Sequence, residues 1–322
     1  MRVRVILVLV ALLISSCSIT QKQAVPSPSS TIISKKNAYF IEASITKLSS
    51  IQCPCIDVEI DSRQFSMELD LGFRGDLSIE EDHIDLIVEK SFVLEKIMHG
   101  VRGKQYPTKI YRIPKAKIGK MTFINPRLEK GSREFTKNST FVADGGRPSP
   151  REEGRIGWHL FQKVNLLIDM KNSRVAFCDS LNTLAEQGYP IENFIRTPLV
   201  LDNGLVQIIG NTPEGALHCM LDTGATWNIL NRALKPHQSL DKAVWEPENI
   251  LEFSYFKIDQ EDFGPINFHR MPIQLPFLVD AILGIEFFEK NLVYLDFVRG
   301  FAYFAKDQSM TTNDEKWNLR LK

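Results

Sequence analysis

Apolar residues along this chain come in short segments that alternate with polar residues and end at turn-forming residues. Residues 56–79, IDVEIDSRQFSMELDLGFRGDLSI, contain two such segments on either side of the polar pair Asp61-Ser62, and a third after an acidic residue and a glycine. Alternation with a period of two predicts strands, and the polar pair predicts a turn between them. Residues 205–230, LVQIIGNTPEGALHCMLDTGATWNIL, repeat the order of strand, turn, strand, acidic residue, glycine and strand.

A second pair of segments, residues 156–177 and 283–304, aligns without gaps. Each predicts a short helical turn followed by a strand hairpin. The identical pairs are Gly157 and Gly284, Phe161 and Phe288, Lys163 and Lys290, Asp169 and Asp296, and Phe177 and Phe304. Since Asp169 and Asp296 sit among apolar residues near the predicted hairpins, we expect them to make structural turns or hydrogen bonds.

Aligning the first pair of segments sets Asp70 opposite Asp222 and Gly72 opposite Gly224. A third match joins IGKMTFINPRL, residues 118–128, with FGPINFHRMPI, residues 263–273. Three landmarks therefore occur in the same order in both halves. This is the sign of an internal duplication, which predicts two similar lobes.

The first half is longer between its landmarks. Asp70 and Gly157 are 87 positions apart, whereas Asp222 and Gly284 are 62 apart, a difference of 25. The alignment assigns about seven of the extra residues to HGVRGKQYPTKIYRI and its flanks, and the rest to a polar loop within residues 129–155. The first insertion predicts a hairpin that could cover a cleft, with Gly103 and Tyr106 as candidate flap residues.

Composition fits a folded protein with two cores. The chain has 322 residues, of which 43% are hydrophobic and 24% charged, enough for two lobes of about 150 residues each. Its 39 basic and 39 acidic residues balance, which gives no reason to expect nucleic acid as a partner. The six histidines show no metal-ligand spacing, so we expect no metal and no cofactor.

The N-terminus, MRVRVILVLVALLISSC, has basic residues, an apolar run and then small residues before Cys17. This layout predicts a secretory signal over residues 1–16, and its apolar run is too short to span a bilayer. Ile14 to Cys17 also resembles the lipobox of bacterial lipoproteins, which implies lipidation at Cys17; the alternative is an ordinary cleaved signal with an incidental cysteine. Residues 17–37 are polar and rich in Ser and Pro, and predict a flexible tether.

Four further cysteines remain in a chain expected to leave the cytoplasm, so disulfides are permitted, but their connectivity cannot be read from the sequence. Buried or structurally bridged thiols are the favoured interpretation. These cysteines are Cys53, Cys55, Cys178 and Cys219.

The stretch LDTGAT, with apolar residues before it and Ile282-Leu283-Gly284 downstream, resembles the signature of aspartic peptidases of the pepsin and retropepsin clan. The similarity extends over nearly all of residues 40–305. It implies an all-β fold with two β-barrel-like lobes in one chain and a central cleft. We place the N-terminal lobe, with its degenerate Asp-Leu-Gly motif and flap, at residues 38–196, and the C-terminal lobe and tail at 197–322.

In that family each lobe supplies one aspartate to a shared pair. Carried over, the resemblance implies that Asp70 and Asp222 are the catalytic dyad. The supporting residues that it implies are Thr223, Gly224, Ala225 and Gly72. The first motif departs from the family pattern, because Leu71 stands where a hydroxyl residue is usual and Phe73 where a small residue is usual. Half of the crossed hydrogen bonding between the two motifs is therefore expected to be missing.

The resemblance implies an aspartic endopeptidase that hydrolyses peptide bonds with water activated by two carboxyl groups. The alternative is a catalytically inactive, protease-like lipoprotein that binds peptides or serves as a scaffold. The expected partners are a peptide or protein substrate and, through the N-terminal lipid, a membrane. We expect a monomer, since one chain holds both lobes, facing the periplasm, with Ser18 after the cysteine favouring the outer membrane.

Overall fold

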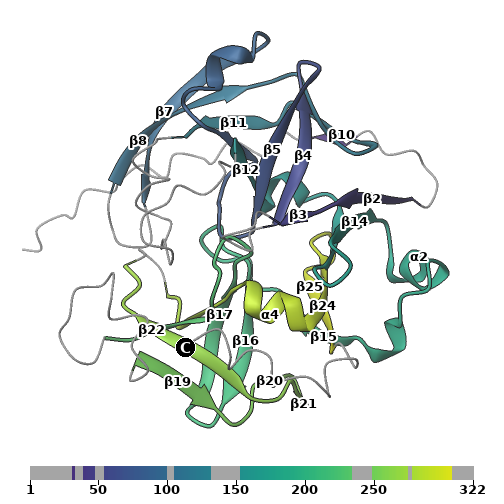
Figure 1. The fold of residues 1–322 in the computed structure, drawn as a ribbon, viewed down its shortest axis with the longest axis vertical. Coiled ribbons are helices and arrows are strands. Elements are labelled where there is room, and N and C mark those ends of the chain that lie inside the picture. The colour runs from purple at the N-terminus through teal and green to yellow at the C-terminus, as the bar shows by residue number, and fades with distance from the viewer. Residues whose placement is uncertain are drawn as a thin grey trace, which may run out of the picture.

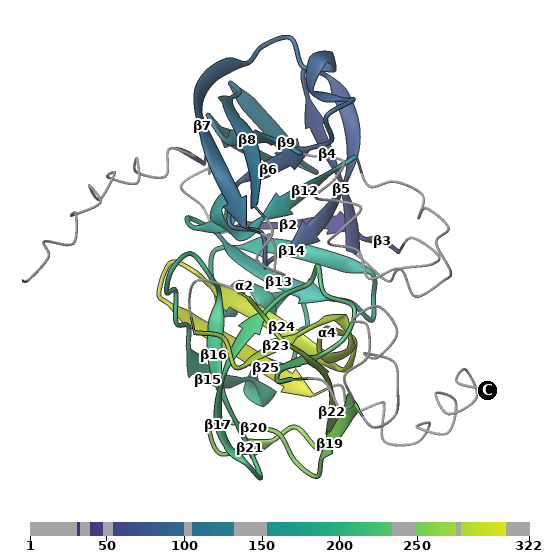
Figure 2. The same ribbon diagram turned by 90° about the vertical axis from the view of Figure 1, so that its left-hand side faces the viewer.

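The protein is almost entirely β-structure over the residues that its computed structural model describes. These residues are 31–32, 39–47, 54–99, 105–131, 153–233, 249–274 and 278–306. Helical segments in these ranges are short: α2 (Leu181–Glu186), α4 (Ile285–Lys290), and the 3-10 turns η1 (Ile84–Leu86), η2 (Trp158–Phe161) and η3 (Ile191–Asn193). The expected all-β fold with two lobes is confirmed (Figures 1 and 2).

The first half forms one curled sheet. Its strands, in spatial order, are β1 (Thr31–Ile32), β10 (Met121–Ile124), β9 (Lys115–Ile118), β4 (Pro54–Ile60), β5 (Arg63–Asp70), β12 (Gly154–Gly157), β6 (Leu77–Ile79), β11 (Arg127–Lys130), β8 (Gln105–Arg112) and β7 (Ser91–His99), with β3 (Thr46–Lys47) paired to β4. Alternation directs one face of each strand inward: on β5, Phe65, Met67 and Leu69 are all buried.

The second half builds its sheet in the same way. The strands, in spatial order, are β19 (Ile250–Phe253), β22 (Ile266–Met271), β18 (Ile229–Asn231), β23 (Ala281–Leu283), β17 (Gly215–Leu221), β16 (Gln207–Thr212), β20 (Lys257–Ile258) and β21 (Glu261–Asp262). Strand β23 lies parallel to β17 and antiparallel to β18, as β12 does to β5 and β6. The duplication in the sequence is therefore a duplication of topology.

A six-stranded sheet joins the halves. Its strands are β15 (Ile195–Pro198), β25 (Phe301–Lys306), β24 (Asn291–Asp296), β13 (Asn165–Asp169), β14 (Arg174–Cys178) and β2 (Phe40–Ser44). The halves meet where β13 pairs antiparallel with β24, and Figure 2 shows β13 and β14 between the upper and lower sheets. The expected boundary between residues 196 and 197 falls inside β15, which pairs with β25.

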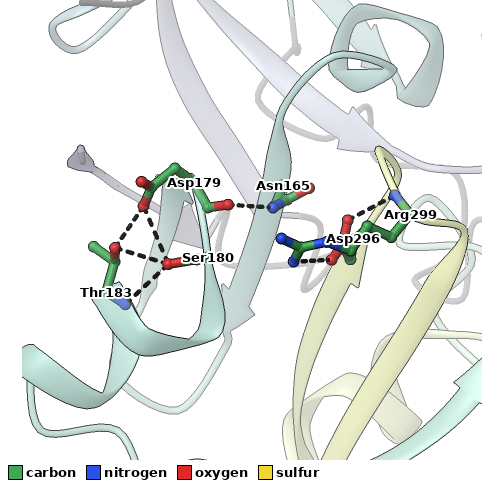
Figure 3. A network of polar contacts seen from close by, with 6 residues as sticks. All are labelled: Asn165, Asp179, Ser180, Thr183, Asp296 and Arg299. Atoms are coloured by element: carbon green, nitrogen blue, oxygen red, sulfur yellow. Dashed lines mark hydrogen bonds and ion pairs between the residues drawn. The ribbon is translucent and has the colours of Figure 1, made fainter. Parts of the chain in front are cut away.

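The repeated aspartates of this central sheet hold its hairpin turns. Asp296 accepts the Arg299 backbone N–H at 2.8 Å and pairs with the Arg299 guanidinium at 3.2 Å (Figure 3). Asp169 accepts the Asn172 N–H at 3.1 Å and pairs with Arg174 Nε at 3.1 Å. The predicted structural role of these two residues is confirmed.

Two expectations from the sequence need correction. Thr31 and Ile32, assigned to the flexible tether, form β1 and pair with β10, because this part of the Ser- and Pro-rich segment contains β-branched residues. The third sequence match is displaced: Ile118 pairs with Val58 on β4 as Ile258 pairs with Gly210 on β16, so Ile118 corresponds to Ile258 and not to Phe263.

Several expectations fall outside the described residues. They concern the signal at residues 1–16, lipidation of Cys17, most of the tether, Cys53, Gly103, most of the polar loop and the C-terminal tail. Of the cysteines that are described, Cys178 and Cys219 are buried free thiols and Cys55 is also buried.

Candidate functional site

Asp70 and Asp222 stand at the ends of corresponding strands. Asp70 is the last residue of β5, and Asp222 directly follows β17. The preceding Leu69 and Leu221 are fully buried, which fixes where each strand leaves its core. Parallel neighbours then hold each aspartate in place: Asp70 is paired with Gly157 on β12, and the Asp222 N–H donates to the Leu283 carbonyl at 3.0 Å.

The two carboxyl groups lie in contact, close enough to share a hydrogen bond. Each is covered by the glycine of the opposite motif. A Cβ added at Gly72 would lie 2.6 Å from Asp222 Cγ, and one added at Gly224 would lie 2.7 Å from Asp70 Cγ. Such distances exclude any side chain at either position unless the carboxyl groups move. The sequence alignment that set Asp70 opposite Asp222 thus identified residues that meet in space.

The Thr223 hydroxyl connects the two motifs. It accepts a hydrogen bond from the Leu71 backbone N–H at 3.1 Å and donates one to the Leu69 carbonyl at 2.5 Å. Thr223 is fully buried, so both bonds are shielded from water. Leu71 has no hydroxyl with which to make the reciprocal bonds, and the site is therefore crossed by one threonine instead of two.

Phe73 does not separate the carboxyl groups. Its ring packs toward two glycines: a Cβ added at Gly75 would lie 2.4 Å from Phe73 Cζ, and one added at Gly157 would lie 2.8 Å from Phe73 Cδ1. The Phe73 N–H donates to Asp70 Oδ1 at 2.9 Å. The large residue is thus accommodated beside the site, and its backbone contributes a hydrogen bond to the first aspartate.

Ala225 occupies the corresponding position in the second motif. Its N–H donates to the Asp222 carbonyl at 3.2 Å, and its own carbonyl accepts the Ile285 N–H at 2.7 Å at the start of α4. A Cβ at Gly284 would lie 2.5 Å from the Ala225 carbonyl oxygen. The glycine that follows β23 is therefore required for the close approach of the Asp222 loop and α4.

The pKa of the Asp222 carboxyl group lies well above the usual value for an aspartate. Burial, and secondly the negative charge of Asp70, raise its pKa to about 8. The Gly224 N–H donates to Asp222 Oδ1 at 2.9 Å and opposes this shift. A buried pair of carboxyl groups with one raised pKa retains a single proton around neutral pH, so that one group can act as a base while the other acts as an acid.

A buried ion pair beside Asp70 was not foreseen from the sequence. Arg155 Nε lies 3.2 Å from Glu68 Oε2 and 3.8 Å from Asp70 Oδ2. Glu68 and Asp70 point to the same face of β5, and Arg155 on β12 is paired with Glu68. The sequence signal was present in the charged residues at positions 68 and 155, where the second half has Met220 and Ile282.

The candidate flap is the hairpin of β7 and β8, at the end of the first-half sheet. Tyr106, near the start of β8, is paired with Met98 and is buried, with 5% of its surface exposed. On β7, Phe92 and Ile97 are more than half exposed. Gly103 comes between β7 and β8 in the sequence and lies outside the described residues.

Within the described ranges, no group of three or more His, Cys, Asp and Glu side chains is placed to hold a metal ion. None of the helices in these ranges is both long and apolar enough to cross a membrane.

Comparisons with known proteins identify the fold. No family model matches the sequence, and no curated protein matches it. Among solved structures, basic 7S globulin from soybean matches with a TM-score of 0.55 and 10% identity, covering 84% of this chain and 95% of that one. Conglutin gamma, a basic 7S globulin from lupine seeds, matches with a TM-score of 0.54, 11% identity and the same coverage. At these identities the likeness concerns the fold alone, and the chain has the two-lobed, pepsin-like fold.

Proposed function

We propose that the protein is an aspartic-type endopeptidase. The observation that carries this proposal is the contact between Asp70 and Asp222, two buried carboxyl groups on corresponding strands, of which Asp222 has a raised pKa. Thr223 and the two facing glycines hold these groups together. A pair of this kind supplies both a base and an acid within one hydrogen-bonded unit.

In the proposed reaction the ionised carboxylate takes a proton from a water molecule as the water oxygen attacks the peptide carbonyl carbon. The protonated carboxyl group gives its proton to the carbonyl oxygen, so a neutral gem-diol forms without a covalent link to the enzyme. Proton transfer to the amide nitrogen then accompanies C–N cleavage and releases an acid and an amine. General acid–base catalysis of this kind needs no metal ion.

A second candidate is a peptide-binding or scaffold protein without activity. Leu71 favours it, because half of the crossed hydrogen bonding between the motifs is absent at this position. The presence of Asp70 in contact with Asp222 favours the enzyme, since a binding protein has no need to bury two like charges together.

The test is a peptidase assay with a mixed peptide library on the chain from Ser18 onward, which keeps β1, from pH 3.5 to 8. Asp70→Asn and Asp222→Asn each keep the size of the side chain and remove one carboxyl group. Asp85→Asn, at an exposed position of η1, is the matched control. We expect cleavage by the parent and the control, and a loss of at least about 10³-fold in both dyad variants. Peptide binding without cleavage in the parent would support the scaffold instead.

We also propose that Cys17 carries a lipid that anchors the protein in the bacterial envelope, on the side of the periplasm. The support is the lipobox-like sequence that ends at this cysteine. Metabolic labelling of the full chain with an alkyne fatty acid tests it. Label and membrane association are expected in the parent and should both be lost in Cys17→Ser; an unlabelled, cleaved parent would contradict the proposal.

A further inference from the structure

The ion pair of Arg155 and Glu68 lies inside the protein, next to the dyad. The exposed fractions of the three side chains are 14% for Arg155, 6% for Glu68 and 12% for Asp70. Arg155 Nε is closer to Glu68, at 3.2 Å, than to Asp70, at 3.8 Å. The guanidinium is therefore shared between two carboxylates, and one of them belongs to the dyad.

The second half shows that the fold does not require this pair. Met220 is paired with Ile282 between β17 and β23, in the register in which Glu68 is paired with Arg155. Both apolar side chains are buried, with 2% and 1% exposed. An apolar pair of similar volume is often as stable as a buried ion pair or more so, because charges lose hydration on burial. Stability alone therefore does not account for the charges in the first half.

The consequence is an asymmetric dyad. Asp222 has the apolar pair beside its strand, whereas Asp70 has a guanidinium within 4 Å. Besides Arg155, the groups facing Asp70 are Glu68 on the same strand, Asp222, and the Phe73 N–H. Other charges of neighbouring elements have their own partners: Asp76 accepts the Arg127 N–H, and Glu129 on β11 binds Lys96. In the described part of the chain, Arg155 is the only cation within ion-pair distance of Asp70.

We propose that Arg155 and Glu68 are a positioning pair for the dyad: Arg155 holds the negative charge on Asp70 and leaves the shared proton on Asp222, while Glu68 restrains Arg155 from binding Asp70 more tightly. Asp70 then serves as the base for water and Asp222 as the acid for the carbonyl oxygen. This assignment of roles rests on the proposed peptidase function, whereas the charge distribution in the unliganded protein does not.

Each member of the pair has a distinct effect. Without Arg155, the ionised form of Asp70 loses an attractive charge, so protonation of the dyad moves to higher pH. Without the Glu68 charge, the attraction of Arg155 to Asp70 is no longer opposed by Glu68 and the two can form a charge-assisted hydrogen bond, so protonation moves to lower pH and Asp70 becomes a weaker base. The two changes have opposite signs, which a purely structural role would not produce.

The test follows the side-chain carboxyl carbons of Asp70 and Asp222 by NMR during a pH titration of the ligand-free, ¹³C-labelled protein. The principal variant, Glu68→Met with Arg155→Ile, copies the apolar pair of the second half. The single variant Glu68→Gln removes only the carboxylate charge. The control, Glu59→Gln with Lys117→Met, removes another ion pair between neighbouring strands, one whose charged atoms lie 2.7 Å apart.

In the parent and the control we expect Asp70 to titrate first from the acid side. In the double variant its midpoint should move up by about one pH unit, a tenfold change in proton affinity, and in Glu68→Gln it should move down. The acid limb of kcat/KM for peptide cleavage should move in the same directions. An unchanged Asp70 midpoint in the folded double variant, or first ionisation at Asp222 in the parent, would overturn the proposal.

Failure of the two proposals can be told apart. Parent protein that titrates as expected but cleaves no peptide contradicts the peptidase function and leaves the positioning pair in place. Active parent with an unshifted titration in the variants contradicts the pair alone. If the double variant does not fold, the direction of the shift in Glu68→Gln decides.

Discussion

The Thr223 hydroxyl is the group that ties the two aspartate loops together. Thr223→Val keeps the shape of the side chain and removes both of its hydrogen bonds, which leaves the buried Leu71 N–H and Leu69 carbonyl without this partner. Unsatisfied buried backbone groups cost about 1 to 3 kcal/mol each. We expect the free energy of unfolding in urea to fall by about 2 to 4 kcal/mol with this substitution.

Thr223→Ser is the matched control, since it keeps the hydroxyl and loses only a methyl group. It should lose less than half as much stability as Thr223→Val. Equal losses in the two variants would mean that packing of the methyl group, and not the crossed hydrogen bonds, holds the loops together.

Asp222 makes stability depend on pH. Its folded-state pKa of about 8 lies above the value of about 4 for an unfolded aspartate, so between these pH values the folded protein keeps a proton that the unfolded chain loses. Stability therefore falls as pH rises through this window. Asp222→Asn removes the ionisable group, and its melting temperature should exceed that of the parent increasingly from pH 4 to 8.

Calorimetry at pH 3.5, 5.5 and 7.5 checks this expectation. Each kcal/mol corresponds to about 1.5 °C for a protein of this size, so the gain in melting temperature at pH 7.5 should be resolvable. At pH 3.5 Asp222 is protonated in both states, and only a pH-independent difference between the two proteins should remain. A gain that is constant across the three pH values would show that Asp222 is not protonated in the folded state.

Sequence predicted the aspartates but not the charges beside them. Asp70 and Asp222 were found because they end apolar segments in a duplicated order, which is a local signal. Glu68 and Arg155 stand where the second half has apolar residues, but neither ends an apolar segment, and an isolated charge in an alternating strand is most simply interpreted as facing solvent. Only the pairing of β5 with β12 brings them together inside the protein.

At the scale of elements, the strands were predicted well and one alignment was not. The match of residues 118–128 with 263–273 is out of register by five positions relative to the observed pairings. The wrong register sets Gly119 opposite Gly264 and Phe123 opposite Phe268, so identical residues supported it. Hydrophobic pattern alone could not detect the error, whereas pairing with β4 and β16 does.

An ion pair connects the hairpin of β7 and β8 to the neighbouring strand β11, and one of its two side chains is much more exposed than the other. Lys96 Nζ on β7 lies 2.6 Å from Glu129 Oε1 on β11; the Lys96 side chain is 32% exposed and that of Glu129 only 3%. Burial raises the pKa of Glu129, and Lys96 opposes this shift. Lys96→Met should destabilise the protein by about 1 to 3 kcal/mol, after allowance for the partial exposure of the lysine, because a buried carboxylate loses its partner.

Lys109→Met on the neighbouring strand is the control. Lys109 and Glu95 are 3.7 Å apart and both more than half exposed, so this substitution should cost little. The loss in Lys96→Met should also be larger at pH 8 than at pH 5, because burial raises the pKa of Glu129 and its neutral form, which needs no cation, is favoured as pH falls. Chemical unfolding at both pH values measures these differences; equal effects of the two substitutions would contradict the role assigned to burial.

At the scale of the molecule, the duplicated order of landmarks was enough to predict two lobes, but not how they are joined. The apolar segments that became β13 and β24 look alike, and nothing in them specifies that each pairs with the other across the halves. The central sheet makes the halves interdependent. Leu166, Leu167 and Ile168 on β13 are all fully buried, and their strand is paired with β24.

This interdependence predicts the behaviour of the separated halves. A cut before β15, between residues 193 and 194, leaves β2, β13 and β14 on one fragment and β15, β24 and β25 on the other. Each fragment then has a new open sheet edge beside an apolar surface, which favours aggregation.

Produced alone, neither fragment should show cooperative unfolding. Refolded together, the two fragments should form a one-to-one complex that unfolds in a single transition, as followed by circular dichroism and light scattering. Cooperative unfolding of either fragment alone would show that the central sheet joins two already stable lobes. The dyad adds a second readout, since Asp70 and Asp222 lie on different fragments and peptide cleavage should appear only in the complex.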